Sequence, residues 1–178
     1  VQEEGEVATR CPNLGCPAQV KGAILHFARR GAMDIDGLGE KLVDQLVDQG
    51  IVKDPSDLYA LTAETIAALE RKAEKSAQNL VAAIDRSRHT TLERLILALG
   101  IRNVGEALAR TLARDFGTIE ALENATLEDL QKSEDVGPTV AASIRDFLDN
   151  PGNRGIVARL HERGVRPAPP APKVEGAL

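Results

Sequence analysis

The sequence has almost no aromatic residues, with three Phe, one Tyr and no Trp among 178 residues. This scarcity disfavours a surface that stacks nucleic-acid bases on aromatic rings. The core must instead be built from Leu, Ile, Val and Ala, which suits closely packed helices. With 43% hydrophobic and 28% charged residues, the composition is that of a globular protein of one or two domains.

The sequence also lacks the features of membrane and secreted proteins. No apolar run approaches the roughly 20 residues that cross a bilayer, and no signal-peptide pattern opens the chain. Two cysteines are too few for a disulfide framework. We therefore expect a cytoplasmic protein with no membrane partner.

Charge is distributed unevenly along the chain. The net charge of −5, taken alone, argues against a polyanionic ligand. Residues 86–114, however, carry six Arg against two Glu, and residues 7–33 carry four basic residues and no acid, whereas residues 115–136 hold seven acids and one Lys. Two interpretations stay open at this point: a basic face for a polyanion, or ordinary solvated helices.

Apolar residues at helical spacing predict helices along nearly the whole chain, bounded by Gly, Pro, Asp and Thr. The expected helices span residues 17–30, 40–49, 54–61, 62–69, 73–86, 91–99, 106–116, 127–131, 138–148 and 153–163. The alternation typical of strands is absent except near the start, so we expect an all-α fold. The final stretch, RPAPPAPKVEGAL, is rich in Pro and Ala and is typical of an extended linker or tail.

One segment is repeated four times. Its anchor positions are Gly39, Ala73, Gly105 and Gly137, spaced by 34, 32 and 32 residues. Four residues after the anchors stand Val43, Ala77, Ala109 and Ala141, and seven after them stand Leu46, Leu80, Leu112 and Ile144. This pattern predicts one tightly packed helix face. A tetratricopeptide-like solenoid has a similar period, but its aromatic and Leu-Gly signatures are missing here.

In this repeat the glycines precede the helices. Glycine tolerates a positive φ in a tight turn and lets another backbone approach closely. The exposed amides of the following helical turn, together with the helix dipole, favour an anion such as a phosphate oxygen. The pattern therefore predicts phosphate binding at the start of each repeated helix.

These segments resemble the helix-hairpin-helix DNA-binding motif. IDGLGEKLV is the closest copy, IRNVGEALA and SEDVGPTVA keep the second glycine, and LERKAEKSA has lost both, so we expect the second copy only to connect helices. The resemblance implies that paired motifs bind the backbone of nicked or duplex DNA across the minor groove, largely without sequence preference. The residues expected to contact DNA are Gly37, Gly39, Lys41, Lys75, Ser76, Arg102, Asn103, Gly105, Gly137 and Thr139.

The cysteine pair, Cys11 and Cys16, has C-x4-C spacing directly ahead of a predicted helix. Zinc with sulfur ligands takes four of them, so the pair is half a site. The three His residues (His26, His89 and His161) have no zinc-ligand spacing. Three interpretations follow from these residues alone: half of a zinc site, a redox dithiol, or small buried residues.

The ordered motifs CPNLGCPAQ, GAMDIDGLGEKLVDQL, EKSAQNL, ALGIRNVGEALA and FGTIEAL are similar to the C-terminal half of bacterial NAD⁺-dependent DNA ligases. The resemblance implies that Cys11 and Cys16 are the second pair of a four-cysteine zinc finger whose first pair is missing, as in an excised fragment. We expect a truncated zinc-finger region (residues 1–22), a helix-hairpin-helix domain (residues 23–167) and a tail (residues 168–178).

The same resemblance implies nick sealing by a parent enzyme that uses NAD⁺ and Mg²⁺ and carries its adenylated lysine in a Lys-x-Asp-Gly motif. That motif does not occur in this sequence, so we expect the chain to bind neither NAD⁺ nor Mg²⁺, to be inactive alone, and to act as a monomer together with the remaining ligase domains.

Alternatives from other classes stay open. They are a stand-alone helix-hairpin-helix module of a repair protein, a protein–protein scaffold in which the repeat serves only packing, and a redox protein that uses the cysteine pair.

Overall fold

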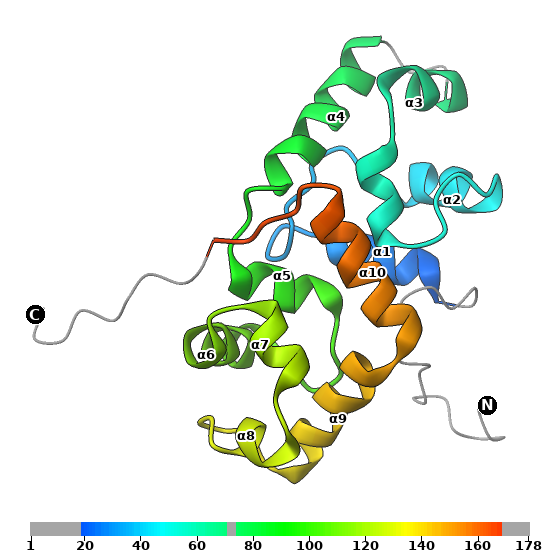
Figure 1. The fold of residues 1–178 in the computed structure, drawn as a ribbon. Helices are drawn as coiled ribbons and strands as arrows, with labels where there is room; N and C mark the ends of the chain where they lie inside the picture. Colours follow the sequence, from blue (N-terminus) through cyan, green and yellow to red (C-terminus); the bar gives the residue numbers. More distant parts are fainter. Residues whose placement is uncertain (1–18, 71–73, 169–178) are drawn as a thin grey trace, which may run out of the picture.

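The computed structural model describes residues 19–70 and 74–168, and the elements of these residues are helices, as the sequence predicts (Figure 1). The α-helices are α1 (Val20–Ala28), α2 (Glu40–Asp48), α3 (Ala63–Glu70), α4 (Glu74–Ser87), α5 (Leu92–Leu99), α6 (Glu106–Phe116), α7 (Ile119–Asn124), α8 (Leu127–Gln131), α9 (Pro138–Asp149) and α10 (Pro151–Glu162), and the 3₁₀ helix is η1 (Pro55–Ala60). None of these helices is long and apolar enough to span a membrane.

Eight of the α-helices in the described residues form four pairs of chain neighbours. Helix α1 packs on α2, α3 on α4, α5 on α6, and α8 on α9. We call α1–α4 with η1 the first unit and α5–α9 the second unit; they fill the upper and lower parts of Figure 1. Contacts between α1 and α5 join the units, and α10 packs on both α9 and η1.

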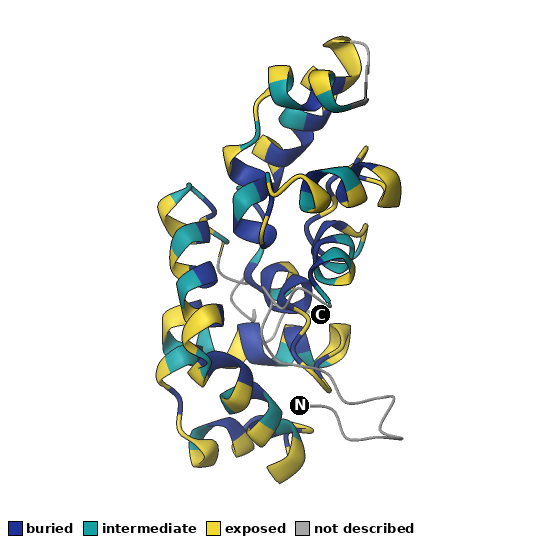
Figure 2. Cartoon of the chain, turned by 90° about the vertical axis from the view of Figure 1, so that its right-hand side faces the viewer, coloured by how far each residue is buried: buried dark blue, intermediate teal, exposed yellow. Residues whose placement is uncertain are grey.

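The predicted packing face of the repeat is confirmed. The small residues four positions after the anchors and the large aliphatic residues seven positions after them are all at most 2% exposed. A small side chain at the first of these positions lets the partner helix come close, and the larger one fills the space behind it. In Figure 2 the buried residues accordingly lie where helices face one another.

Several helix boundaries follow from capping residues. The Thr91 side chain accepts a hydrogen bond from the Arg94 amide at the start of α5, and Asp54 does the same for the Ser56 amide at η1. Helix α10 begins at Pro151, two residues before the predicted start, because Asn150 caps it. Helix α7 was not predicted.

Ala168, the first residue of the predicted tail, forms backbone hydrogen bonds with residues around the start of α5. The backbone amide of Arg166 donates a hydrogen bond to the Arg88 carbonyl, and that of Ala168 donates one to the Thr90 carbonyl. The Leu92 amide donates in turn to the Ala168 carbonyl. Ala168 therefore belongs to the folded domain. The backbone hydrogen bonds that hold it there cannot be predicted from the pattern of side chains.

Candidate nucleic-acid interface

Three turns that precede repeated helices share one backbone geometry. They are hairpin 1 (residues 34–39), hairpin 3 (residues 100–105) and hairpin 4 (residues 132–137). Each places a residue in the left-handed region two positions before its anchor glycine: Gly37 at φ 94°, Asn103 at φ 69° and Asp135 at φ 65°. Asn and Asp are the side chains that tolerate this region best, which explains how hairpins 3 and 4 form without the first glycine of the motif.

The anchor glycines themselves do not need a positive φ. Gly39, Gly105 and Gly137 have φ values of −94°, −96° and −91°, which are extended conformations open to any residue. The expectation that a positive φ explains glycine at these anchors is therefore wrong. Only Gly37, among the glycines predicted to contact DNA, has that role.

The free space around the anchor glycines explains better than their backbone conformation why glycine stands at these positions. A Cβ placed on Gly39, Gly105 or Gly137 would meet no other heavy atom within 4 Å, and all three residues are exposed. No side chain caps α2, α6 or α9, whereas η1, α5, α7, α8 and α10 are all capped by a side chain. The first-turn amides of α2, α6 and α9 thus point outward without a side-chain acceptor, and another backbone can approach them.

Each hairpin is held rigidly beneath this open corner. The residue between the left-handed position and the anchor is buried in every case: Leu38, Val104 and Val136 are 5–7% exposed. The anchor carbonyl accepts the first intrahelical bond, as in the 2.9 Å bond from the Ala109 amide to Gly105. Core packing therefore fixes the direction of the free amides before any ligand arrives.

Hairpin 2, the turn between α3 and α4, includes residues 71–73, which lie outside the described residues. The predicted contact residues that follow it, Lys75 and Ser76, are exposed in the first turns of α4. The expectation that this turn only connects helices stays a prediction.

The basic side chains fall into two groups. One group bonds the protein's own carbonyls and carboxylates: Lys21, Arg88, Arg110, Arg114, Lys132, Arg145, Arg154, Arg159 and Arg163. Lys21, for example, joins α1 to α2, and its hydrogen bond to Asp48 raises its pKa. These residues serve the scaffold.

The other group has no hydrogen-bond or ion-pair partner for its side chain among residues 19–70 and 74–168. It consists of Arg29, Arg30, Lys41, Lys53, Lys75, Arg86, Arg94, Arg102 and Arg166. All three basic residues predicted to contact DNA, Lys41, Lys75 and Arg102, are in this group and are exposed. Their charges are thus available to an external anion.

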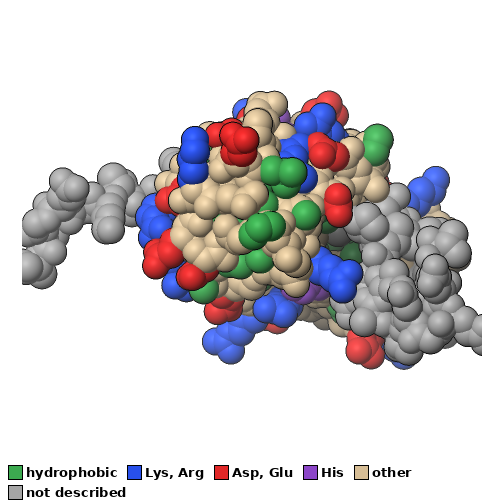
Figure 3. All heavy atoms as spheres, turned by 90° about the horizontal axis from the view of Figure 1, so that it is seen from below, with side chains coloured by type: hydrophobic (Ala, Val, Ile, Leu, Met, Phe, Trp, Pro, Cys, Tyr) green, Lys and Arg blue, Asp and Glu red, His purple; other side chains and the backbone are tan. Residues whose placement is uncertain are grey.

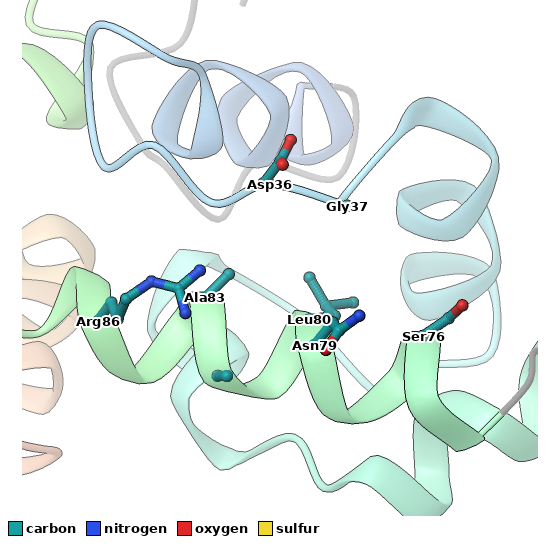
Figure 4. Close-up of a pocket in the computed structure, with 8 residues that line it drawn as sticks. Asp36, Gly37, Ser76, Asn79, Leu80, Ala83 and Arg86 are labelled. Carbon is teal, nitrogen blue, oxygen red and sulfur yellow. The ribbon is translucent and has the colours of Figure 1, made fainter.

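Two grooves flank hairpin 1, and both include Asp36 and Gly37. Arg29 and Lys41 help to line the first groove. The second, with a volume of about 460 Å³, lies between hairpin 1 and α4 (Figure 4) and is lined by Asp36, Gly37, Ser76, Asn79, Leu80, Ala82, Ala83 and Arg86.

Sequence reasoning named Ser76 in this second groove but missed Asn79 and Arg86. Asn79 and Arg86 follow Ser76 by three and ten residues, a spacing that places all three on one face of a helix. This spacing could have identified them from the sequence.

Hairpins 3 and 4 differ in charge. Hairpin 3 carries the exposed Arg102, and the side-chain Nδ2 of its Asn103 donates a 2.9 Å hydrogen bond to Oγ of Ser143 on α9. Hairpin 4 has the same backbone but exposes Glu134 and Asp135, with Thr139 exposed just beyond it. Seen from below, the end of the molecule that contains α8 and α9 shows acidic and basic side chains around small apolar patches (Figure 3).

The predicted zinc ligands, Cys11 and Cys16, lie outside the described residues. Within residues 19–70 and 74–168, no group of three or more His, Cys, Asp or Glu side chains is placed to hold a metal ion. The half zinc site therefore stays a prediction from the sequence.

Three family models match the chain. Residues 1–18 match the NAD-dependent DNA ligase C4 zinc finger domain. Residues 30–86 match the SAM-like helix-hairpin-helix tandem and residues 94–157 the helix-hairpin-helix motif, so these two matches fall on the first and second units.

Curated proteins named DNA ligase match nearly the whole chain. The chain is 55% identical to a DNA ligase of Nitrosococcus oceani over 93% of this chain and 25% of that protein. It is 52% identical to a DNA ligase of Trichlorobacter lovleyi over 99% of this chain and 26% of that protein. It is 56% identical to a DNA ligase of Marinobacter nauticus over 93% of this chain and 24% of that protein.

The chain is similar to a zinc-finger and helix-hairpin-helix segment of NAD-dependent DNA ligases. It spans about a quarter of the length of the curated ligases that it matches. The resemblance read from the ordered motifs is thereby confirmed, as is an all-helical helix-hairpin-helix fold after a segment of the ligase zinc finger.

Proposed function

We propose that this chain binds the sugar-phosphate backbone of duplex DNA from the minor-groove side, without sequence preference. In this proposal it is the DNA-binding part of a bacterial enzyme that seals nicks, using NAD⁺ and Mg²⁺ bound by other domains. Such an enzyme works in the cytoplasm, where the chromosome lies. The zinc finger to which Cys11 and Cys16 belong would be completed by cysteines outside this sequence.

The single observation that carries the proposal is the repeated open corner. Three helices of eight residues or more begin at an exposed glycine with no capping side chain and free space where a Cβ would stand. A protein that used these turns only for packing would gain stability from Ser, Thr, Asp or Asn at those positions, as at the starts of η1, α5, α7, α8 and α10. The uncapped amides and unpaired cations suit a phosphate backbone better than an apolar partner.

The proposal is tested by titrating a fluorescent nicked duplex and an intact duplex with the 178-residue chain at several salt concentrations. If Lys41, Lys75 and Arg102 each neutralise one phosphate, the logarithm of the association constant falls with the logarithm of salt with a slope of about −2.7. Changing the duplex sequence should leave the affinity nearly constant, because backbone contacts carry no base information.

A protein–protein scaffold predicts the opposite result. It would show no salt-dependent binding of either duplex at low ionic strength, and that outcome would overturn the proposal.

A further inference from the structure

We propose that the groove between hairpin 1 and α4 is an additional phosphate-binding subsite, in which Arg86 and Asn79 bind the backbone of the same duplex that hairpin 1 holds. The inference rests on the proposed function, because it needs a bound duplex. It adds two residues that neither the motif nor the glycine pattern identifies.

Three polar residues of the groove, Ser76, Asn79 and Arg86, lie along one face of α4. Ser76, Asn79, Ala83 and Arg86 follow one another at intervals of three, four and three residues, which is one face of an α-helix. Ten residues of helix rise by about 15 Å, and a DNA strand carries one phosphate per roughly 3.4 Å of axis. The row is therefore long enough to follow several phosphates beyond the corner at Gly39.

Arg86 is free for such a role, whereas its neighbour Arg88 is not. The Arg88 guanidinium donates to the carbonyls of Arg163 and Tyr59 and pairs with Asp85. The exposed Arg86 side chain has no partner in the described part of the chain and lines the groove instead. Arg88 therefore stabilises the fold through its hydrogen bonds, whereas the Arg86 side chain faces the open groove.

The shape of the groove admits a backbone. The Leu80 side chain packs near Gly37 at one part of the groove, whereas the α4 positions between Leu80 and Arg86 that line it are small, at Ala82 and Ala83. Figure 4 shows the Arg86 guanidinium extending along α4 toward Ala83, and the Asp36 carboxylate turned away from α4. The Asp36 carboxylate thus leaves the part of the groove next to Arg86 open to an anion.

The second unit provides an internal comparison, because α9 repeats α4 at a spacing of 64 residues. Ser143 stands where α4 has Asn79, Asp146 where it has Ala82, and Asn150 where it has Arg86. The hydrogen bond from Asn103 to Ser143 spans the corresponding space between hairpin 3 and α9. Packing of the repeat therefore requires neither Arg86 nor Asn79, and their presence in the first unit points to a ligand.

The test compares Arg86→Gln with Lys53→Gln in the same duplex titrations. Lys53 is a matched control, because it is exposed and its side chain has no partner in the described residues. It lies after the C-terminal end of α2, whereas hairpin 1 lies before the N-terminal end of that helix. We expect Arg86→Gln to weaken binding about tenfold at low salt and to make the salt slope shallower by about 0.9. Lys53→Gln should leave both nearly unchanged.

Asn79→Ala separates hydrogen bonding from charge. It should weaken binding severalfold while the salt slope stays constant, because no counterion release is lost. Thermal unfolding should be alike in all three variants, since these side chains are exposed.

If the unmodified chain fails to bind DNA, the proposed function is wrong. If it binds and Arg86→Gln matches Lys53→Gln in affinity and slope, only the subsite is wrong.

Discussion

The Arg159 guanidinium of α10 lies 3.0 Å from Oδ2 of Asp54, a residue 105 positions earlier at the start of η1. One turn further along the chain, Nη1 of Arg163 donates a 2.7 Å hydrogen bond to the carbonyl of the fully buried Ser56 and pairs with Asp57. Because α10 also packs on α9, these bonds connect the first unit to the second. The relative positions of the hairpins therefore depend on polar contacts far from any of them.

Arg163→Ala should lower the free energy of unfolding by about 1–3 kcal/mol, because the buried carbonyl of Ser56 loses a charged donor. Arg94→Ala is the control, since Arg94 is exposed and its side chain has no partner in the described residues, and it should change stability by less than about 0.5 kcal/mol. Urea unfolding followed by circular dichroism measures both. Equal stability of the two variants would contradict a linking role for Arg163.

Gly105 and Gly117, at the two ends of α6, should respond to alanine in opposite ways. Gly117 has φ +76°, so Gly117→Ala should cost about 1 kcal/mol of stability and leave DNA binding intact. Gly105 is extended, so Gly105→Ala should change stability by less than about 1 kcal/mol but weaken DNA binding, because its methyl group would occupy the open space above the amides. Thermal unfolding and duplex titration of both variants give the comparison.

The same pair decides why glycine stands at the anchors. A loss of stability without a loss of binding in Gly105→Ala would mean that the glycine serves the fold.

Asp135→Gly would restore the missing first glycine of hairpin 4. Relief of the left-handed strain and the added freedom of the unfolded chain nearly offset each other, so stability should change by less than about 0.5 kcal/mol. Removal of this carboxylate should tighten binding about threefold at low salt if hairpin 4 holds a phosphate, because two like unit charges ~7 Å apart in water repel by about 0.6 kcal/mol. Duplex titration measures the affinity, and unchanged binding at low salt would show that hairpin 4 stays away from the DNA.

The repeat made much of this molecule predictable from sequence. A small residue and a large aliphatic residue recur at fixed distances from each anchor, and local helix geometry alone sends them into the core, as with Ala109 and Leu112. Asn103 was assigned to the first-glycine position from the motif, and it does adopt the left-handed conformation expected there. These features depend on short-range periodicity, which a sequence displays directly.

Features that depend on distant parts of the chain were not predictable. The exposed Arg86 and the bonded Arg88 are both ordinary arginines in the sequence, and only their surroundings separate a free cation from a scaffold cation. Gly105 could have been chosen for conformation or for space, and the periodicity cannot distinguish the two. Helix α7 was missed for a different reason, because its capping residue, Thr118, is a local start signal that the sequence does display.

Tyr59 provides a direct measurement of packing near the contact between η1 and α4. It is the only tyrosine, and there is no tryptophan, so phenolate absorbance reports this residue alone. Its hydroxyl is 2.7 Å from Oγ of Ser87, and burial raises its pKa to about 12 despite the nearby Arg88 guanidinium. We expect a spectroscopic midpoint near pH 12 in the folded chain and near pH 10 in denaturant.

The raised pKa also fixes the sign of an alkaline effect on stability. The folded state holds the phenol proton more tightly than the unfolded state, so the contribution of Tyr59 is complete below pH 10 and is lost as the pH rises toward 12. The loss amounts to about 2 kcal/mol at pH 12. Tyr59→Phe has no proton to lose, and its unfolding free energy should fall less steeply over this window. A native midpoint near pH 10 would mean that water reaches the ring and that η1 does not stay packed against α4.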